Sequence, residues 1–265
     1  MTHPSTPAWT GPRWIAHRGA GKLAPENTLA AFRLGASLGW RAYECDVKLS
    51  ADGVPFLLHD ATLARTLASG LGLEPTLSPD TVAGSLPWSR LARLDAGAWH
   101  GRLYAGEAPP TLEAIARWCL ANRLALNVEI KPTPGEEVRT GAVVAAAVQR
   151  LWTDAVAAGD AAWPLLSSFR PESLAAALQD APGLPRALLL DSLWDDCLGV
   201  AERLGCGAVV LNHQLVDGPQ AIDDLHARGM QALVYTVNDA DRAATLLAWG
   251  IDAVITDAVD RFVPD

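Results

Sequence analysis

The strongest constraint on the fold is a regular alternation of short apolar runs with stretches of helical periodicity. Eight such runs occur, at 14–17, 42–49, 124–130, 164–169, 186–191, 208–212, 232–238 and 252–257. The intervening stretches, such as 239–250, often open on a good N-cap residue and end at glycine. Eight β–α repeats in a chain of 265 residues are typical of a closed parallel barrel. We therefore expect an α/β protein, a single (β/α)8 TIM-barrel domain over residues 1–265.

An open, doubly wound sheet is the alternative architecture for the same alternation. A Rossmann sheet carries the pattern GxGxxG directly after its first strand, where the glycines let the backbone approach a pyrophosphate. The segment "HRGAGKLAPENT" that follows the first run here does not fit that pattern. The barrel is therefore the favoured interpretation.

One further apolar run, 54–59, requires a different interpretation. Asp52-Gly53 is a two-residue hairpin signal, and a hairpin produces antiparallel neighbours, whereas barrel strands are parallel. We expect 54–59 to return beside the second barrel strand, in a register that places His59 across from Asp46. The stretch 60–110 is too long for a simple loop, and we expect it to be a small inserted subdomain over the barrel mouth.

The composition narrows the classes of function. The chain is 50% hydrophobic and 19% charged, with a formal net charge of −9, which is typical of a globular protein and makes nucleic acid an unexpected partner. The N-terminus has no apolar core of signal-peptide length, and no run is long enough to span a membrane. The four cysteines form no CxxC pair. We expect a cytoplasmic protein with buried thiols; the oligomeric state is left open.

Three acidic residues are the candidate metal ligands. Glu44 and Asp46 lie two apart in a strand and therefore share one face. Glu129 ends another strand, at the barrel face where active sites are built. Carboxylates in an apolar setting need a cation, and three of them suit Mg²⁺ or Ca²⁺. The alternative is that they form salt bridges with basic neighbours, namely Arg18, Lys48 and Lys131.

Two histidines lie beside these acids. His17 ends the first strand and His59 follows the return strand. Imidazoles titrate near neutral pH and can act as general base and general acid. Arg18 and Lys131 add positive charge, and an arginine fork suits a phosphate. A metal, two histidines and two cations together favour attack on a phosphodiester.

The same residues carry a recognisable pattern. "AHRG…PENT" (16–28), "ECDVKLSADG…LLHD" (44–60) and "VEIKP" (128–132) resemble the glycerophosphodiester phosphodiesterase family, in particular its bacterial cytoplasmic branch. Later segments, "DAGAWHG", "PPTLEA", "LLSSF", "VYTVN" and "AVITDAVD", resemble further motifs of that family in order, so the resemblance covers about 14–258.

The resemblance implies a phosphatidylinositol-phospholipase-like barrel and a divalent metal. It implies hydrolysis of small glycerophosphodiesters, such as glycerophosphocholine and glycerophosphoethanolamine, to sn-glycerol 3-phosphate and an alcohol. The residues that match the family's functional positions are His17 and His59 (catalytic), Glu44, Asp46 and Glu129 (metal), and Arg18 and Lys131 (phosphate). Tyr235 departs from the pattern, because many relatives carry Trp there, and this bears on fine specificity only.

Two other functions remain open at this point. A lysophospholipase D-type phosphodiesterase would use the same barrel and metal but would need a wide apolar mouth or membrane-facing loops. A non-catalytic, metal-dependent binding module would keep the acids but would not need both histidines. The sequence leaves undecided the headgroup, the choice of Mg²⁺ or Ca²⁺, which histidine is the acid, and whether a cyclic phosphate forms.

Overall fold

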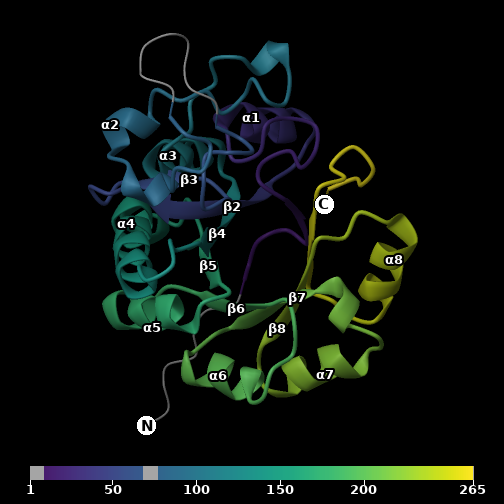
Figure 1. Cartoon of the computed structure of the whole chain (residues 1–265). Coiled ribbons are helices and arrows are strands. Elements are labelled where there is room, and N and C mark those ends of the chain that lie inside the picture. Colours follow the sequence, from purple (N-terminus) through teal and green to yellow (C-terminus); the bar gives the residue numbers. More distant parts are fainter. Residues whose placement is uncertain (1–8, 68–76, 265) are drawn as a thin grey trace.

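The structure is a computed structural model that describes residues 9–67 and 77–264 (Figure 1). Within these residues, eight parallel strands close a barrel. The strands are β1 (Trp14–Ala16), β2 (Ala42–Leu49), β4 (Ala125–Ile130), β5 (Leu165–Ser168), β6 (Arg186–Leu190), β7 (Ala208–Asn212), β8 (Gln231–Tyr235) and β9 (Ala253–Thr256). Because β1 pairs with both β9 and β2, the sheet has no open parallel edge. The expected (β/α)8 barrel is confirmed.

Helices connect the strands and cover the outside of the barrel (Figure 1). They are α1 (Leu29–Ser37), α3 (Leu112–Asn122), α4 (Glu137–Ala157), α5 (Pro171–Asp180), α6 (Cys197–Arg203), α7 (Gln220–Ala227) and α8 (Ala240–Ala248). Side chains of Thr28, Thr111 and Asp239 cap α1, α3 and α8, which satisfies backbone N–H groups that a helix leaves unpaired. No helix follows β9 in the described part of the chain; Phe262 instead stacks on Trp14, with ring centroids 4.4 Å apart.

Strand alternation divides the core into two layers. One buried cluster lies between strands and helices and includes Tyr43, Cys45 and Val47. A second cluster fills the barrel interior with Ile15, Ala42 and other small or branched residues. Successive strand residues point to opposite faces, so Glu44 and Asp46, which follow Ala42 at steps of two, face the interior. Their predicted common face is confirmed, as is the opposite direction of Cys45.

The additional strand β3 (Pro55–Leu57) runs antiparallel to β2, as predicted, but in a different register. Leu58, not His59, is opposite Asp46, since its N–H donates to the Asp46 carbonyl. The expected two-residue turn is wrong: the loop has three residues, because the Gly53 N–H bonds the Ser50 carbonyl and Gly53 has φ +82°. A type I turn followed by a left-handed glycine adds one residue to the loop.

The described part of the stretch 60–110 packs partly against the hairpin and partly against the barrel. It contains η1 (Ala83–Ser85), α2 (Trp88–Leu91) and η2 (Arg102–Tyr104), while residues 68–76 lie outside the described part. Leu63, Leu86 and Leu91 form a hydrophobic cluster with Phe56 and Leu58 of the hairpin, distinct from both barrel clusters. The cluster anchors the stretch to the edge where His59 lies. Figure 1 shows β3 and α2 on the side of the barrel that also carries α3.

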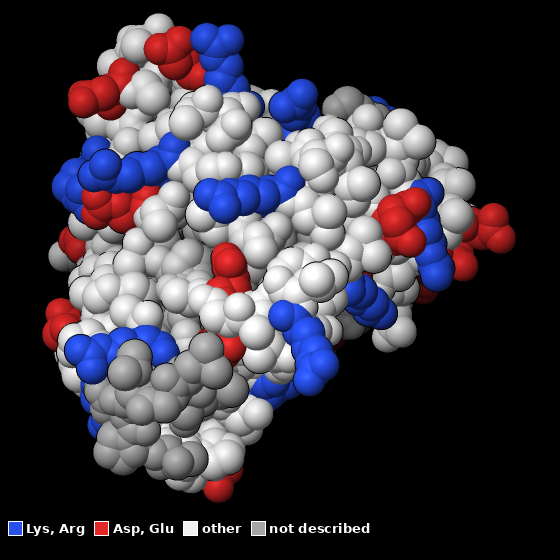
Figure 2. Space-filling view, turned by 90° about the horizontal axis from the view of Figure 1, so that it is seen from above, with Lys and Arg blue, Asp and Glu red and all other residues white. Residues whose placement is uncertain are grey.

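The surface and the cysteines agree with the composition. In Figure 2 acidic and basic side chains are interspersed over the visible face. All four cysteines, at 45, 119, 197 and 206, are buried and free. Among the described residues, no helix is long and apolar enough to cross a membrane.

Candidate active site

The predicted metal ligands meet at the C-terminal end of the barrel strands. Glu44 and Asp46 lie on β2 and Glu129 on β4, and Asp46 is in register with Glu129. One carboxylate oxygen from each lies within 4.8 Å of the others, and all three residues are buried. Burial and the neighbouring carboxylates raise the pKa of Glu44 well above its ordinary value, and they raise the pKa of Glu129 to about 7. Three buried acids at this spacing repel one another without a cation.

Two basic side chains supply part of the positive charge that the three carboxylates need. Lys131 Nζ lies 2.8 Å from Glu129 Oε1 and 3.2 Å from Asp46 Oδ1, and Arg18 Nε lies 3.0 Å from Asp46 Oδ2. Burial alone would raise the pKa of Asp46, but Lys131 and Arg18 outweigh it and the pKa is lowered. The salt bridges considered as an alternative to a metal are therefore present for Arg18 and Lys131. Among the described residues Lys48 makes no ion pair; its Nζ donates to the Lys131 carbonyl.

A tight turn after β1 brings Arg18 into this cluster. Arg18 has φ +51°, a left-handed conformation that is costly for a side chain with a Cβ atom. Its N–H donates to Glu44 Oε2 at 3.1 Å. Gly21 has φ +54°, and a Cβ atom there would collide with the Asp257 carbonyl. The close approach explains why glycine occupies this position of the turn.

Asn27 holds Asp46 from both sides. Its Nδ2 donates to Asp46 Oδ2 at 2.8 Å, and its Oδ1 accepts the Asp46 N–H at 3.1 Å. Asn27 is buried and has φ +58°, a conformation that asparagine tolerates better than most residues. Because the buried Asn27 side chain makes both of these hydrogen bonds with Asp46, it fixes the direction of the Asp46 carboxylate.

His17 is held by a carboxylate that binds its Nδ1 atom. Its Nδ1 lies 2.6 Å from Asp257 Oδ1, and its Nε2 lies 3.7 Å from Glu44 Oε2. Asp257 follows β9, and Asn238 supports it by accepting its N–H at 2.8 Å. A carboxylate on Nδ1 keeps the proton there and leaves Nε2 to exchange protons in the site.

His59 has the same arrangement on the opposite side of the cluster. Its Nδ1 lies 2.7 Å from Asp60 Oδ1. Arg65 binds Asp60 through Nε at 2.8 Å and also binds Glu26, which in turn pairs with Arg18 at 3.0 Å. Burial is the largest cause that lowers the pKa of His59, so the ring is biased toward its neutral form. Through Arg65, the inserted stretch therefore helps to hold both His59 and Arg18 in place.

The two histidines border a cleft with a narrow and a wide compartment. The narrow compartment, about 150 Å³, lies over the barrel centre between His17, Glu44 and Tyr235. The wide compartment, about 740 Å³, extends over the ends of β4, β5 and β6 to Trp194. Residues that border both are His59, Glu129, Lys131, Phe169 and Leu189. A substrate with two parts joined by a phosphate fits such a cleft in shape.

The donor set fits a hard divalent cation. Among the described residues, Glu44 Oε1 is buried without a hydrogen-bond partner and Asp46 Oδ1 is buried with only the ion pair to Lys131, although buried polar atoms are nearly always paired. Both belong to the carboxylate triad, and oxygen ligands of this kind are those that Mg²⁺ and Ca²⁺ take in proteins. Asn127 Nδ2 is also buried without a hydrogen-bond partner among the described residues, and Asn127 borders the narrow compartment. The triad can therefore bind a divalent metal, whose identity the residues do not distinguish.

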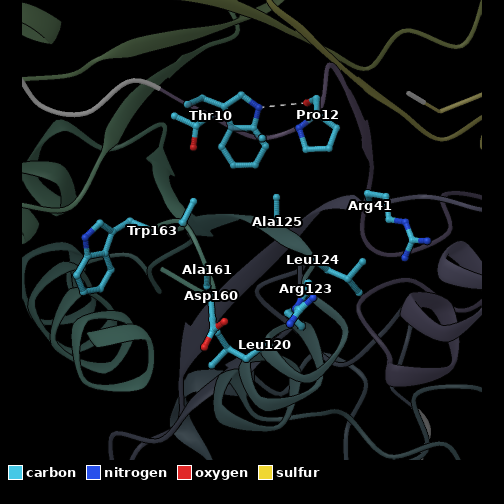
Figure 3. Close-up of a pocket in the computed structure, with 14 residues that line it drawn as sticks. Thr10, Pro12, Arg41, Leu120, Arg123, Leu124, Ala125, Asp160, Ala161 and Trp163 are labelled. Atoms are coloured by element: carbon cyan, nitrogen blue, oxygen red, sulfur yellow. Dashed lines mark hydrogen bonds between the residues drawn. The ribbon is translucent and has the colours of Figure 1, made fainter. Parts of the chain in front are cut away.

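A second hollow lies at the opposite end of the barrel (Figure 3). It is bordered by residues that precede the strands, including Pro12, Arg41 and Trp163, with a volume of about 240 Å³. Figure 3 shows Arg41 and Trp163 on opposite sides of it. None of the predicted catalytic, metal or phosphate residues borders this hollow.

The motifs and this geometry agree with the comparisons. The sequence model of the glycerophosphoryl diester phosphodiesterase family matches residues 17–261. The chain belongs to this family. A glycerophosphodiester phosphodiesterase from Caldanaerobacter subterraneus subsp. tengcongensis is 28% identical over 255 residues, which cover 94% of this chain and 95% of that relative.

Solved structures of this family are also similar. A phosphodiesterase from Oleispira antarctica, in complex with the product sn-glycerol-3-phosphate, has 32% identity and a TM-score of 0.80, covering 94% of each chain. A glycerophosphodiester phosphodiesterase from Agrobacterium tumefaciens has 26% identity and a TM-score of 0.73, covering 94% of this chain and 97% of that chain. The enzyme class expected from the motifs is therefore confirmed.

The seven predicted site residues come together, and the structure adds others that sequence reasoning missed. Asn27 and Asp257 lie within the quoted family segments "PENT" and "AVITDAVD". These motifs pointed to the two residues, but they did not indicate which residues they bind. Asp60 directly follows His59, which was a usable signal. Glu26 also lies within "PENT", but Arg65 carries no local signal, because the two residues meet only through the folded insertion.

Proposed function

We propose that this protein hydrolyses small glycerophosphodiesters, such as glycerophosphocholine and glycerophosphoethanolamine, to sn-glycerol 3-phosphate and an alcohol. The observation that carries the proposal is one cleft bordered by two histidines and by Glu44 and Glu129, two members of the buried carboxylate triad. Each of those histidines has its Nδ1 bound to an aspartate. The product named for the Oleispira antarctica relative supports the choice of substrate.

The two histidines are the proposed proton-transfer groups. With Nδ1 occupied by Asp257 or Asp60, each ring has Nε2 left to accept or donate a proton. One histidine takes the proton of the nucleophile, which is water or the glycerol 2-hydroxyl, and the other gives a proton to the leaving alcohol. Lowering of the His59 pKa favours a neutral ring able to accept a proton.

Glu44, Asp46 and Glu129 are the proposed ligands of a divalent cation, Mg²⁺ or Ca²⁺. When bound, such an ion supplies Lewis acidity toward a phosphate oxygen and helps to orient the substrate. Its positive charge would also relieve the repulsion among the three carboxylates, and this would free Arg18 and Lys131 from part of their present ion pairing.

Arg18 and Lys131 are the proposed phosphate-binding groups. Both remain charged, since the nearby carboxylates outweigh burial and raise the pKa of each. Positioned cations stabilise the charge that develops on phosphoryl oxygens during displacement. The inserted stretch 60–110 is proposed to restrict entry to the cleft, as expected from the sequence. The cytoplasm stays the predicted location.

The test is release of sn-glycerol 3-phosphate by the purified protein from glycerophosphocholine and glycerophosphoethanolamine. The assay is run after chelation and again with Mg²⁺ or Ca²⁺ restored, with Glu44→Ala as control. Release that needs the metal and is absent in the control supports the proposal. A folded protein that releases nothing with either ion, but cleaves a lysophospholipid, would favour the lysophospholipase D-type alternative instead.

A further inference from the structure

The wide compartment of the cleft contains two groups that the proposed reaction does not use. Asp191 and Trp194 both border it and lie in the loop between β6 and α6. Trp194 is 40% exposed, although it is among the largest hydrophobic side chains of the protein. An exposed indole on the wall of a substrate cleft is available to contact what enters the cleft.

Asp191 is an acid without a neutralising partner in the described part of the chain. Its carboxylate accepts a hydrogen bond from the neighbouring Ser192 hydroxyl at 3.2 Å, and it forms no ion pair with any described residue. Asp60, the other aspartate of the same compartment, is bound by both His59 and Arg65. Tyr235, which borders the narrow compartment, has its pKa raised by burial and by the charges of Asp191 and Glu129.

The aromatic groups of the compartment divide in the same way. Lys131 Nζ lies 5.7 Å from the centroid of Phe169, whose edge meets Tyr235. Trp194 has no cation or aromatic partner among the described residues. The compartment thus combines an unpaired carboxylate with an unpaired indole, the combination that binds organic ammonium ions by charge attraction and cation–π contact.

We propose that Asp191 and Trp194 form a specificity site for a cationic leaving alcohol, an ethanolamine or choline type of headgroup. The inference rests on the proposed phosphodiesterase function, because it assumes that the phosphate lies near Arg18 and Lys131. The wide compartment adjoins those groups through Lys131 and His59. The glycerol part would then occupy the narrow compartment, and the ammonium group would lie toward β6.

The same compartment also contains positive charges, near the ends of β2, β4 and β5. Lys131 is paired with Asp46 and Glu129, and Lys48 is 3% exposed. Arg170 follows β5 and has no ion pair in the described residues. Its charge opposes that of Asp191, so removing it should strengthen the preference for a cation.

The test compares two substrates of the same shape. Glycerophosphocholine carries a trimethylammonium group, and its 3,3-dimethylbutyl analogue has a neutral carbon in place of the nitrogen. The measured quantity is the ratio of kcat/KM for the two, which general damage to the catalyst leaves unchanged. We expect wild type to prefer the cation by about tenfold, and Asp191→Asn and Trp194→Ala to reduce that ratio to about one to three. Trp194→Phe should keep most of it, and Arg170→Gln should raise it.

Asp195→Asn is the matched control, because it removes the same charge from the same loop at a position that does not border the cleft. Its ratio should equal that of wild type. A wild-type ratio near one, or equal loss in Asp195→Asn and Asp191→Asn, would overturn the specificity site while hydrolysis of the neutral analogue still upheld the phosphodiesterase. If neither substrate were hydrolysed with either metal, the proposed function would fail, and the specificity site with it.

Discussion

Both ends of the barrel are hollowed and both contain arginines, but among the described residues only the C-terminal end buries a cluster of carboxylates. At the C-terminal ends of the strands, Asp46 is fully buried between Arg18 and Lys131. At the N-terminal ends, Arg41 and Asp160 border the hollow of Figure 3 but are exposed to solvent. An exposed charge costs little to keep, whereas a buried one must be matched by neighbours. A cluster of buried carboxylates therefore distinguishes the candidate active site from the hollow at the N-terminal end.

The difference arises within single strands. Along the interior face of β2, Ala42 comes first and is followed by Glu44 and Asp46. On β4, Asn127 and Glu129 lie in register with these two acids. The N-terminal half of the interior is thus apolar and closes the barrel below the acids. These apolar interior residues contribute to stability, whereas the acids at the C-terminal ends of β2 and β4 belong to the proposed chemistry.

Removing the metal should have the largest effect and should act at one end only. Chelation, or Glu44→Gln, should reduce turnover of glycerophosphocholine to background, because the triad loses its cation or a ligand. Asp160→Asn at the opposite end should keep full activity. The measurement is release of sn-glycerol 3-phosphate with metal restored; equal losses in the two variants would contradict the assignment of the two ends.

Replacing a histidine should come next in size. His17→Ala and His59→Ala should each lower kcat by about 10²–10⁴, the range for loss of a general acid or base. His226→Ala is the matched control, since His226 is exposed on α7 and pairs with Asp252 outside the cleft. Both active-site variants should keep their affinity for the metal. Near-normal turnover in either one would remove that histidine from proton transfer.

Metal binding should depend on pH because of Glu129. Burial raises its pKa to about 7 in the metal-free protein, so the carboxyl holds a proton at pH 6 and has lost it at pH 8. A bound ion needs the carboxylate, and the affinity should therefore rise with pH, by up to about tenfold per unit below pH 7 for one displaced proton. Calorimetric titration with Mg²⁺ or Ca²⁺ at pH 6 and pH 8 tests this; equal affinities would contradict the raised pKa of Glu129.

The sequence was sufficient for the strands and for the groups fixed by strand geometry. Period-two alternation placed Glu44 and Asp46 on one face, and strand order placed Glu129 beside them. It was insufficient where a single residue in a turn mattered, because the three-residue loop ending at Gly53 shifted His59 by one position relative to Asp46. Periodicity carries no information on such a shift.

Contacts between distant segments were also beyond the sequence. Asp257 lies 240 positions from His17, and Arg65 lies 39 positions from Glu26. Neither pair has a local signature, since each is brought together only when the barrel closes or the insertion folds. The residues that touch the proposed chemistry could be predicted from motifs, whereas the contacts that hold them in place could not.

The smallest expected effect compares two arginines with the same backbone strain. Arg18 and Arg123 both have left-handed backbones, with φ of +51° and +54°. Arg123 is the C-cap of α3 at the N-terminal end of the barrel, and its side chain forms no ion pair in the described residues. Arg123→Gly should relieve the strain and raise the free energy of unfolding by about 0.5–1 kcal/mol, with unchanged turnover.

Arg18→Gly should relieve the same strain but abolish much of the activity, because it also removes the partner of Asp46 and Glu26. Thermal unfolding and turnover measured on both variants separate the two effects. If Arg123→Gly lowered activity as Arg18→Gly does, the strain at both ends would serve the reaction. The expected difference instead means that the backbone strain at Arg123, the C-cap of α3, has no role in the reaction. The strain at Arg18 is maintained by the contacts that its guanidinium makes.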